Sequence, residues 1–287
     1  MRSPIQRASV CFFSMAAAAL VVACGADTTG GGDGAGSTSG SGSTSGGGSA
    51  SGKGGFNIQF PDDRGGGGNQ GGGGSGTNSE GCGVIVATVR DLKDSHADFE
   101  KDEYNKGLTK GLVKAQLDGQ RLPEYAHDKA TVITSQATFS QWYRDTNDVN
   151  MKFSVPLPLK QEAPGLFVFD NDAFFPLDNK GFGNQGRVHN FHFTTEIRGG
   201  FIYKGGEKFT FKGDDDVWVF VNGKLALDLG GVHGVNTETI DFDAMAGTLG
   251  IKKGNTYSFD VFHAERHTSA SHFRMETTVE CLTVTVL

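Results

Sequence analysis

The sequence of 287 residues has no cluster of lysine or arginine, and its formal net charge is −7 with a pI near 5.6. A nucleic-acid-binding surface normally shows a basic patch, so the composition argues against that class of protein. The sequence also lacks a phosphate-binding loop, a dinucleotide fingerprint and a Ser-His-Asp arrangement. Only 37% of the residues are hydrophobic, whereas 44 are glycine, so much of the chain is not core.

The glycine is unevenly distributed, and more than half of it lies between residues 25 and 81. Residues 25–80 are rich in Gly and Ser, and such a composition cannot bury enough apolar surface to offset the entropy of ordering. We therefore expect a disordered tether with a root-mean-square span of roughly 40 Å. The island at residues 56–60 alternates like a strand but has no partner nearby, and we assign it no role. Residues 81–287 are expected to form one domain.

Residues 1–24 have the features of a lipoprotein signal peptide. Two arginines precede an apolar, Ala-rich run that is too short for an ordinary spanning helix, and the run ends in LVVAC at Cys24. Small residues before a cysteine resemble the bacterial lipobox, in which the cysteine is lipidated and becomes the new N-terminus. The sequence thus predicts an exported protein that a lipid anchor holds on a membrane, at the outer membrane or cell surface. The alternative is a plain signal peptide in which Cys24 is incidental.

Cys82 and Cys281 are the two other cysteines of the mature chain, and they lie at the two ends of the expected domain. An exported compartment permits disulfides, so we predict a bond between them. The chain-entropy model gives roughly 5 kcal/mol as the upper limit for closing so long a loop. The alternative is two free thiols or two metal ligands.

From residue 155 onward, short apolar segments recur at regular intervals between Gly, Asn and Asp turns. This pattern indicates a mostly β protein, an antiparallel β-sandwich or barrel with a few short helices, in which the 22 phenylalanines fill the core. Phe191 and Phe193 should face inward and the polar residues between them outward. The expected strands are 83–90, 157–159, 165–169, 191–197, 201–204, 208–211, 217–221, 224–229, 237–242, 257–263 and 273–284. Short helical segments are expected within 91–100, at 111–117 and at 139–144, the last capped by Thr134 or Ser135.

The densest β signal and the densest acid cluster coincide at residues 209–234. Asp214, Asp215 and Asp216 precede an apolar run, and Asn222-Gly223 then predicts a type I′ turn between two hairpin strands. Adjacent carboxylates repel one another unless they are solvated or neutralised, and Ca²⁺ is a natural neutraliser because it prefers oxygen ligands. The alternative is an exposed turn in which the aspartates accept hydrogen bonds from their own backbone.

Several motifs in order resemble the fibro-slime domain, over residues 86–281. They are TVRD at 88–91, DSH at 94–96, DFE at 98–100, QWYRD at 141–145, NQG at 184–186, HNFHFT at 189–194, the block 213–234 and FHAERH at 262–267. That family is similar to the protective-antigen-like barrel that yeast flocculin adhesins use. The resemblance implies a β-sandwich barrel at a cell surface.

By analogy with the flocculins, the resemblance also implies a calcium site. Two adjacent aspartates joined by a cis peptide would hold Ca²⁺ while nearby loops hold sugar hydroxyls, and the alignment places this pair at Asp214-Asp215. Asp216, which stands where relatives often have glycine, and Glu265 are further candidate metal ligands. The candidate ligand-loop residues are Trp218, Asn222, His233, His263 and His267.

The histidines at 263 and 267 offer a competing reading as a zinc site. A zincin needs both histidines one helical turn apart, but the flanking residues 257–262 indicate a strand, which would separate them by about 13 Å. The function predicted first is a non-enzymatic, calcium-dependent module that binds extracellular polysaccharide or another surface glycan in adhesion or matrix. The alternatives are an envelope-glycan hydrolase, whose carboxylate pair nothing in the sequence identifies, and a purely structural matrix component.

Overall fold

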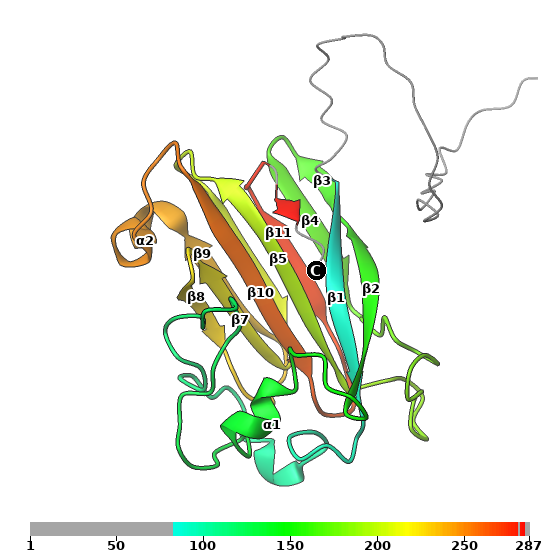
Figure 1. Ribbon diagram of the computed structural model, residues 1–287. Helices are drawn as coiled ribbons and strands as arrows, with labels where there is room; N and C mark the ends of the chain where they lie inside the picture. The colour runs from blue at the N-terminus through cyan, green and yellow to red at the C-terminus, as the bar shows by residue number, and fades with distance from the viewer. Residues whose placement is uncertain (1–82, 281, 285–287) are drawn as a thin grey trace, which may run out of the picture. The chain divides into compact units, whose positions relative to one another are not determined.

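The computed structural model describes residues 83–280 and 282–284, which form two antiparallel β-sheets packed face to face (Figure 1). The strands are β1 (Val84–Leu92), β2 (Asn150–Pro158), β3 (Lys160–Ala163), β4 (Leu166–Asn171), β5 (Phe193–Ile202), β6 (Lys208–Gly213), β7 (Asp216–Val221), β8 (Lys224–Leu229), β9 (Asn236–Asp241), β10 (Thr256–Glu265), β11 (Phe273–Thr277) and β12 (Thr283–Val284). The helices are the 3₁₀ turn η2 (Asp102–Tyr104), α1 (Gln136–Ser140) and α2 (Phe242–Leu249). The predicted fold class, a mostly β sandwich with a few short helices, is confirmed.

The seven-stranded sheet has the order β2-β1-β5-β10-β7-β8, with β12 also paired to β5, and the five-stranded sheet has the order β3-β4-β11-β6-β9. The main core lies between the two sheets and is rich in phenylalanine. The rings of Phe209 on β6 and Phe259 on β10 meet across it, edge to face, with centroids 4.9 Å apart. This geometry is favourable for aromatic pairs, so the phenylalanines join the sheets as well as filling the space between them.

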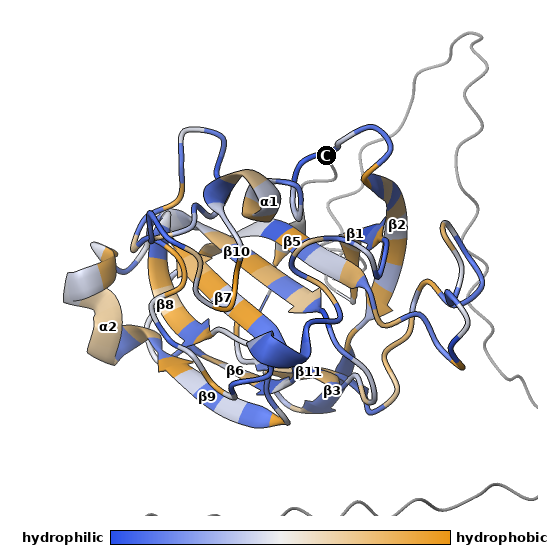
Figure 2. Ribbon diagram, turned by 90° about the horizontal axis from the view of Figure 1, so that it is seen from below, coloured by the Kyte–Doolittle hydropathy of each residue, from blue (hydrophilic) through white to orange (hydrophobic). Residues whose placement is uncertain are grey.

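A second core lies on the outer face of the seven-stranded sheet. It is covered by residues 93–149, which we call the outer loop layer and which contain α1; Figure 2 shows α1 on the side of this sheet away from the five-stranded one. From the sheet, Trp218 packs here against Trp142, and Phe262 packs against Tyr143. Because both faces of the sheet are covered, all six residues of β7 are buried. The expectation that polar residues near Phe193 face solvent is therefore wrong, and His192 is fully buried.

The hairpin of β7 and β8 is confirmed. Its turn has positive φ at both central positions, 53° at Asn222 and 70° at Gly223, as a type I′ turn requires. The helix expected at 139–144 is present but lies earlier in the chain, as α1 (Gln136–Ser140), and residues 141–143 form a turn. Ser135 caps the helix through a reciprocal capping box with Thr138.

Other sequence-based expectations were wrong where tertiary pairing outweighs local pattern. Residues 111–117 form no helix, because their backbone pairs with the edge of β8, as in the bond from Leu225 N–H to Ala115 O. The two strands expected at 191–197 and 201–204 are one strand, β5, which β10 pairs along its whole length. The strand expected at 273–284 is two, because the chain leaves the five-stranded sheet after β11 and joins the other sheet as β12. Helix α2 was not predicted, although Asp241 caps its start and Gly250 ends it.

No helix among residues 83–280 and 282–284 is long and apolar enough to cross a membrane. The signal peptide, the lipidation site Cys24, the tether and the island at residues 56–60 lie outside the described residues. So do Cys82 and Cys281 of the predicted disulfide. These features stay predictions.

Candidate functional site

Asp214 and Asp215 form the link between the two sheets. Strand β6 ends at Gly213 in the five-stranded sheet, and β7 begins at Asp216 in the seven-stranded sheet. The peptide bond between Asp214 and Asp215 is cis, as the resemblance implies. A Cβ on Gly213 would lie 2.2 Å from the backbone oxygen of His272, so only glycine fits at the end of β6. The crossing between sheets thus fixes two consecutive carboxylates at one end of the sandwich.

The acidic segment is not an exposed tip. Asp214 and Asp215 are 4% and 5% exposed, and Asp216 is 0% exposed. The alternative of an exposed acidic turn is therefore wrong, because loops before β9 and after β10 close over the sheet junction. Buried carboxylates need hydrogen bonds or a counter-charge, so the partners of each one define what the site can do.

Backbone and histidine groups orient the first two carboxylates. Asp214 Oδ1 accepts from the backbone N–H of His272 at 2.6 Å, and its Oδ2 lies 3.0 Å from Nδ1 of the same histidine. Asp215 Oδ1 accepts from the N–H of His233 at 3.1 Å, and its Oδ2 accepts from the N–H of Arg266 at 3.2 Å. Each carboxylate oxygen can accept more than one partner, so this pair is held in place but not saturated.

Asp216 has a different environment. Its Oδ1 accepts from the N–H of Gly231 at 2.6 Å, and its Oδ2 forms a buried ion pair with Arg266 Nε at 2.6 Å. The same guanidinium donates from Nη1 to the carbonyl oxygens of Asp98 and Val132, both at 3.0 Å. Asp216 therefore anchors the outer loop layer to the sheet junction, and of the three aspartates it is the one that does not line the cleft described next.

A cleft of about 190 Å³ opens beside the aspartate pair. Beside the aspartate pair, three segments line it: the residue after η2, the loop between β8 and β9, and the loop between β10 and β11. The lining residues are Asn105, Asp214, Asp215, Val232, His233, Gly234, His267, Thr268, Ser269 and Ala270. Carboxylates, hydroxyls, an amide and backbone groups dominate this surface, which suits a polar ligand.

Glu265 lies behind the cleft and places a fourth buried carboxyl group beside it. Its side chain is fully buried at the end of β10, and neither carboxylate oxygen has a partner in hydrogen-bonding geometry within the described residues, although the Ser271 hydroxyl and the Asp215 carboxylate are nearby. Burial, followed by the charges of Asp215 and Asp214, raises the pKa of Glu265 well above its usual range. Burial and the charge of Asp216 likewise raise the pKa of Asp215 to about 7, against the opposing effect of Arg266.

These groups fit a hard divalent cation. Four buried carboxylates face one buried guanidinium, and the available donor atoms are oxygens, which Ca²⁺ prefers. Within residues 83–280 and 282–284, no set of three or more His, Cys, Asp or Glu side chains is spaced to hold a metal ion by itself. An ion held by Asp214 and Asp215 would therefore need backbone oxygens, water or ligand hydroxyls as well.

The structure divides the remaining candidates. His233 and His267 line the cleft, but Trp218, Asn222 and His263 do not. Trp218 is buried in the second core and donates to Asp228 Oδ1 at 3.0 Å, and the Asn222 amide donates to Leu249 O at the far end of β7. Strand β7 thus places Trp218 in the second core and Asn222 at the end away from the junction, so neither contacts the cleft.

His263 supports the site from within the core. Its Nε2 lies 3.0 Å from the backbone oxygen of Asp214, and burial lowers its pKa to about 4. His263 and Glu265 belong to strand β10, as the flanking pattern predicts, so the helical spacing of a zincin is not present there. Sequence reasoning missed Asn105, which lies more than a hundred residues before the aspartates and carries no local signal.

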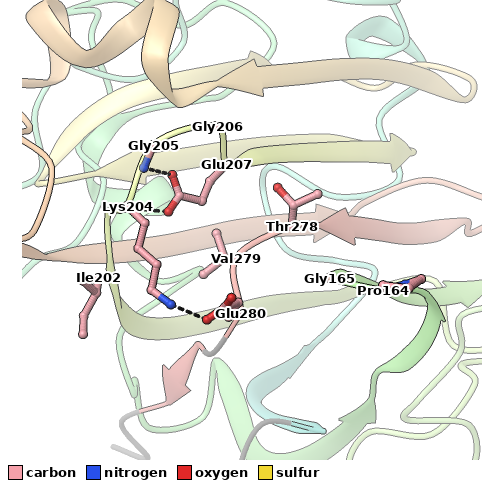
Figure 3. A pocket seen from close by; sticks show the side chains of 10 residues that line it. All are labelled: Pro164, Gly165, Ile202, Lys204, Gly205, Gly206, Glu207, Thr278, Val279 and Glu280. Atoms are coloured by element: carbon pink, nitrogen blue, oxygen red, sulfur yellow. Dashed lines mark hydrogen bonds and ion pairs between the residues drawn. The ribbon is translucent and has the colours of Figure 1, made fainter.

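A larger cleft of about 350 Å³ lies at the opposite end of the sandwich (Figure 3). The side chain of Glu207 accepts there from the N–H groups of Lys204 at 2.5 Å and Gly205 at 2.7 Å, and Lys204 pairs with Glu280 (Figure 3). The charged side chains of Lys204, Glu207 and Glu280 thus already have partners. The smaller cleft, with its surplus of buried carboxylates, is the candidate functional site.

Residues 178–285 match the family model of the PA14 domain. This region contains the aspartate pair and the loops at 232–234 and 266–270 of the cleft, but it does not contain the outer loop layer. Over this region the chain is therefore similar to the PA14 domain, in line with the protective-antigen-like barrel that the sequence resemblance implies.

Curated relatives occur in Dictyostelium discoideum. Protein psiQ is 38% identical over 218 residues, which is 71% of this chain and 22% of psiQ. Protein psiN is 38% identical over 226 residues, which is 68% of this chain and 30% of psiN. The chain thus spans less than a third of the length of either relative.

Two solved structures show sugar-binding proteins with a remote likeness. The PA14 sugar-binding domain of an RTX adhesin aligns over 71% of this chain and 95% of its own, with 10% identity and a TM-score of 0.30. The A domain of epithelial adhesin 9 from Candida glabrata, solved in complex with Galβ1-4GlcNAc, aligns over 72% of this chain and 94% of its own, with 14% identity and a TM-score of 0.30.

Proposed function

We propose that this protein is a surface carbohydrate-binding module whose cleft holds Ca²⁺ at Asp214 and Asp215 and binds sugar hydroxyls there. The observation that carries the proposal is the surplus of buried carboxylates at the sheet junction, including a fully buried Glu265 without a hydrogen-bond partner in the described part of the chain. Uncompensated buried charge is costly, so a bound cation would stabilise this arrangement. The PA14 match to the same region supports the assignment.

The charge of the cleft favours neutral glycans. Asp214, Asp215, Asp216 and Glu265 outnumber Arg266 by three charges when all are ionised, and a divalent cation offsets two of them. The site then has no net positive charge, so an acidic sugar would gain little attraction and would meet residual repulsion. When bound, Ca²⁺ supplies coordination positions for hydroxyl oxygens, while the chain's own carboxylates hold the ion and its loops contact the rest of the sugar.

The second part of the proposal concerns the type of domain and how it is attached to the membrane. Within the PA14 fold we assign the chain to the fibro-slime type, on the motifs at 88–100, 141–145 and 262–267, and to a lipoprotein anchored through Cys24. A Gly/Ser-rich tether would hold the module away from the membrane for adhesion or matrix assembly. Replacing Cys24 by Ser should move the protein from the membrane fraction to the soluble fraction, and unchanged fractionation would exclude the lipid anchor.

Calorimetry of the mature chain with CaCl₂ tests the metal site. We expect one binding event in the parent and its loss in Asp214→Asn and in Asp215→Asn, because each change removes a negative charge and leaves the fold's hydrogen-bond acceptor in place. Asp128→Asn is the matched control, since Asp128 is exposed and distant in sequence from the cleft. Circular dichroism confirms that each variant remains folded.

A glycan array, run with CaCl₂ and with EDTA, tests the ligand. Retention of neutral glycans that EDTA abolishes supports the proposal. Absence of a calcium binding heat in the parent would exclude the metal site. Absence of both metal binding and glycan retention would leave the structural matrix role, and turnover of an arrayed glycan would favour the hydrolase.

A further inference from the structure

One wall of the cleft comes from outside the region that matches the PA14 domain. Residues 100–105, which we call the wall loop, include the turn η2 and end at Asn105. The PA14 match begins at residue 178. The wall loop therefore lies outside the matched region, and it belongs to the outer loop layer.

Three contacts fasten the wall loop to the loop after β10. The backbone N–H of Glu100 donates to Arg266 O at 2.8 Å, and Thr268 N–H donates to Glu100 Oε1 at 3.0 Å. His267 Nε2 lies 3.3 Å from Asp102 Oδ1. These bonds span more than 160 residues of sequence, so two distant parts of the chain form one continuous wall.

The segment after Asn105 is fastened on its other side to the loop between β8 and β9. Gly107 N–H donates to Val232 O at 3.0 Å, and Thr109 N–H donates to Gly230 O at 2.6 Å. A Cβ on Gly231 would lie 2.8 Å from Gly107 O, so the two segments are in close backbone contact. Asn105 is thus held between two anchored stretches, and its position over the cleft is set before any ligand arrives.

Asn105 is exposed, and within residues 83–280 and 282–284 its side-chain carboxamide makes no hydrogen bond, whereas its backbone N–H donates to Asp102 O at 3.2 Å. A carboxamide offers two N–H donors and one acceptor oxygen, which matches the donor and acceptor character of neighbouring sugar hydroxyls. The cleft histidines are less available. His233 Nε2 is 3.1 Å from Leu229 O, and His267 Nδ1 is 2.6 Å from Thr268 O.

We propose that Asn105 is a specificity-determining residue of the cleft, hydrogen-bonding hydroxyls of a neutral glycan that the aspartate pair holds through its cation. The wall loop then decides which glycan is accepted, while the matched region supplies the general sugar site. This inference rests on the proposed function, because it needs the cleft to bind a glycan.

Asn105→Ala in the mature chain tests the assignment. The parent and the variant are compared on a glycan array in CaCl₂, and the glycan retained most strongly by the parent is then titrated against both by surface plasmon resonance. One or two lost hydrogen bonds predict an affinity about 3- to 30-fold weaker and a changed ranking of glycans. The calcium affinity should stay within about twofold, because Asn105 is not proposed to touch the ion. Asn147→Ala, an exposed asparagine elsewhere in the outer loop layer, is the control and should leave the ranking intact.

The outcomes separate this inference from the function beneath it. A parent that retains glycans with an Asn105→Ala variant of equal affinity and ranking overturns the role of Asn105 and leaves the proposed function standing. A parent that retains no glycan overturns both. Weaker glycan binding together with an equal loss of calcium affinity would make Asn105 part of the metal site and would also overturn the specificity role.

Discussion

The buried pair between Arg266 and Asp216 gives a sharp test of how the site is built. Both side chains are 0% exposed, and Arg266 Nε donates to the carboxylate at 2.6 Å. Its guanidinium also donates hydrogen bonds to two backbone carbonyl oxygens and lies 4.9 Å from the ring of Trp142. Arg266→Met keeps a long unbranched side chain but leaves Asp216 charged, buried and without its partner.

The expected loss in the free energy of unfolding is about 3–5 kcal/mol, the usual effect of removing one partner of a buried ion pair. For a domain of about 200 residues this corresponds to a Tm lower by about 6–20 °C. Adding Asp216→Asn should recover about 1–3 kcal/mol, because it removes the stranded charge and keeps an acceptor for the N–H of Gly231. Arg274→Met is the control: Arg274 pairs with carboxylates on the exposed face of the five-stranded sheet, where such pairs contribute about 0–1 kcal/mol.

Urea unfolding in EDTA, followed by tryptophan fluorescence, measures these differences without a contribution from metal. Both tryptophans of the chain are fully buried; Trp142 lies against Arg266 and Trp218 packs on Trp142, so their emission should report loss of the ion pair. A loss below about 1 kcal/mol in Arg266→Met would refute the reasoning. The reasoning would also be refuted if Arg266→Met with Asp216→Asn were less stable than Arg266→Met alone. That result would mean that the unpaired Asp216 carboxylate was not the cause of the loss.

Three further predictions concern the pH dependence of stability, the sheet junction and the cysteines. Burial raises the pKa of Asp91 to about 6, so the folded state disfavours its ionisation, and the free energy of unfolding should fall as pH rises from about 4 to 7. Asp91→Asn should flatten that slope in urea titrations, and an unchanged slope would contradict the burial argument. Gly213→Ala should cost about 1–3 kcal/mol in thermal unfolding, because its Cβ would meet a backbone oxygen at 2.2 Å, whereas Gly119→Ala, with open space around it, should cost little. Thiol titration of the denatured, unreduced mature chain should find no free thiol if Cys82 and Cys281 are bonded, and two free thiols would exclude the bond.

Local pattern was sufficient for the parts of the fold that neighbouring residues decide. The hairpin of β7 and β8 follows from alternation and from Asn222-Gly223, whose positive φ values match the twist of paired strands. The cap of α1 at Ser135 follows from a side chain that reaches a backbone N–H three residues on. The position of the cis aspartate pair came from the resemblance to a family and not from local pattern.

Local pattern was insufficient wherever a partner lies far along the chain. The roles of the three aspartates depend on His233, Arg266 and His272, and the ion pair of Asp216 spans 50 residues. The outer loop layer buries the second face of β5 and β7, so polar residues expected in solvent are in a core.

The sequence by itself therefore determined an antiparallel β-sandwich with an acid cluster at one strand end. Hydrophobic alternation and turn chemistry act over a few residues, and these are enough to set strands and their faces. Only the tertiary structure decided that Asp216 is tied to Arg266 while Asp214 and Asp215 line a cleft, and that Asn105 forms its other wall. Burial and long-range hydrogen bonds give Asp216 a different role from Asp214 and Asp215. Both depend on which distant segments the fold brings together.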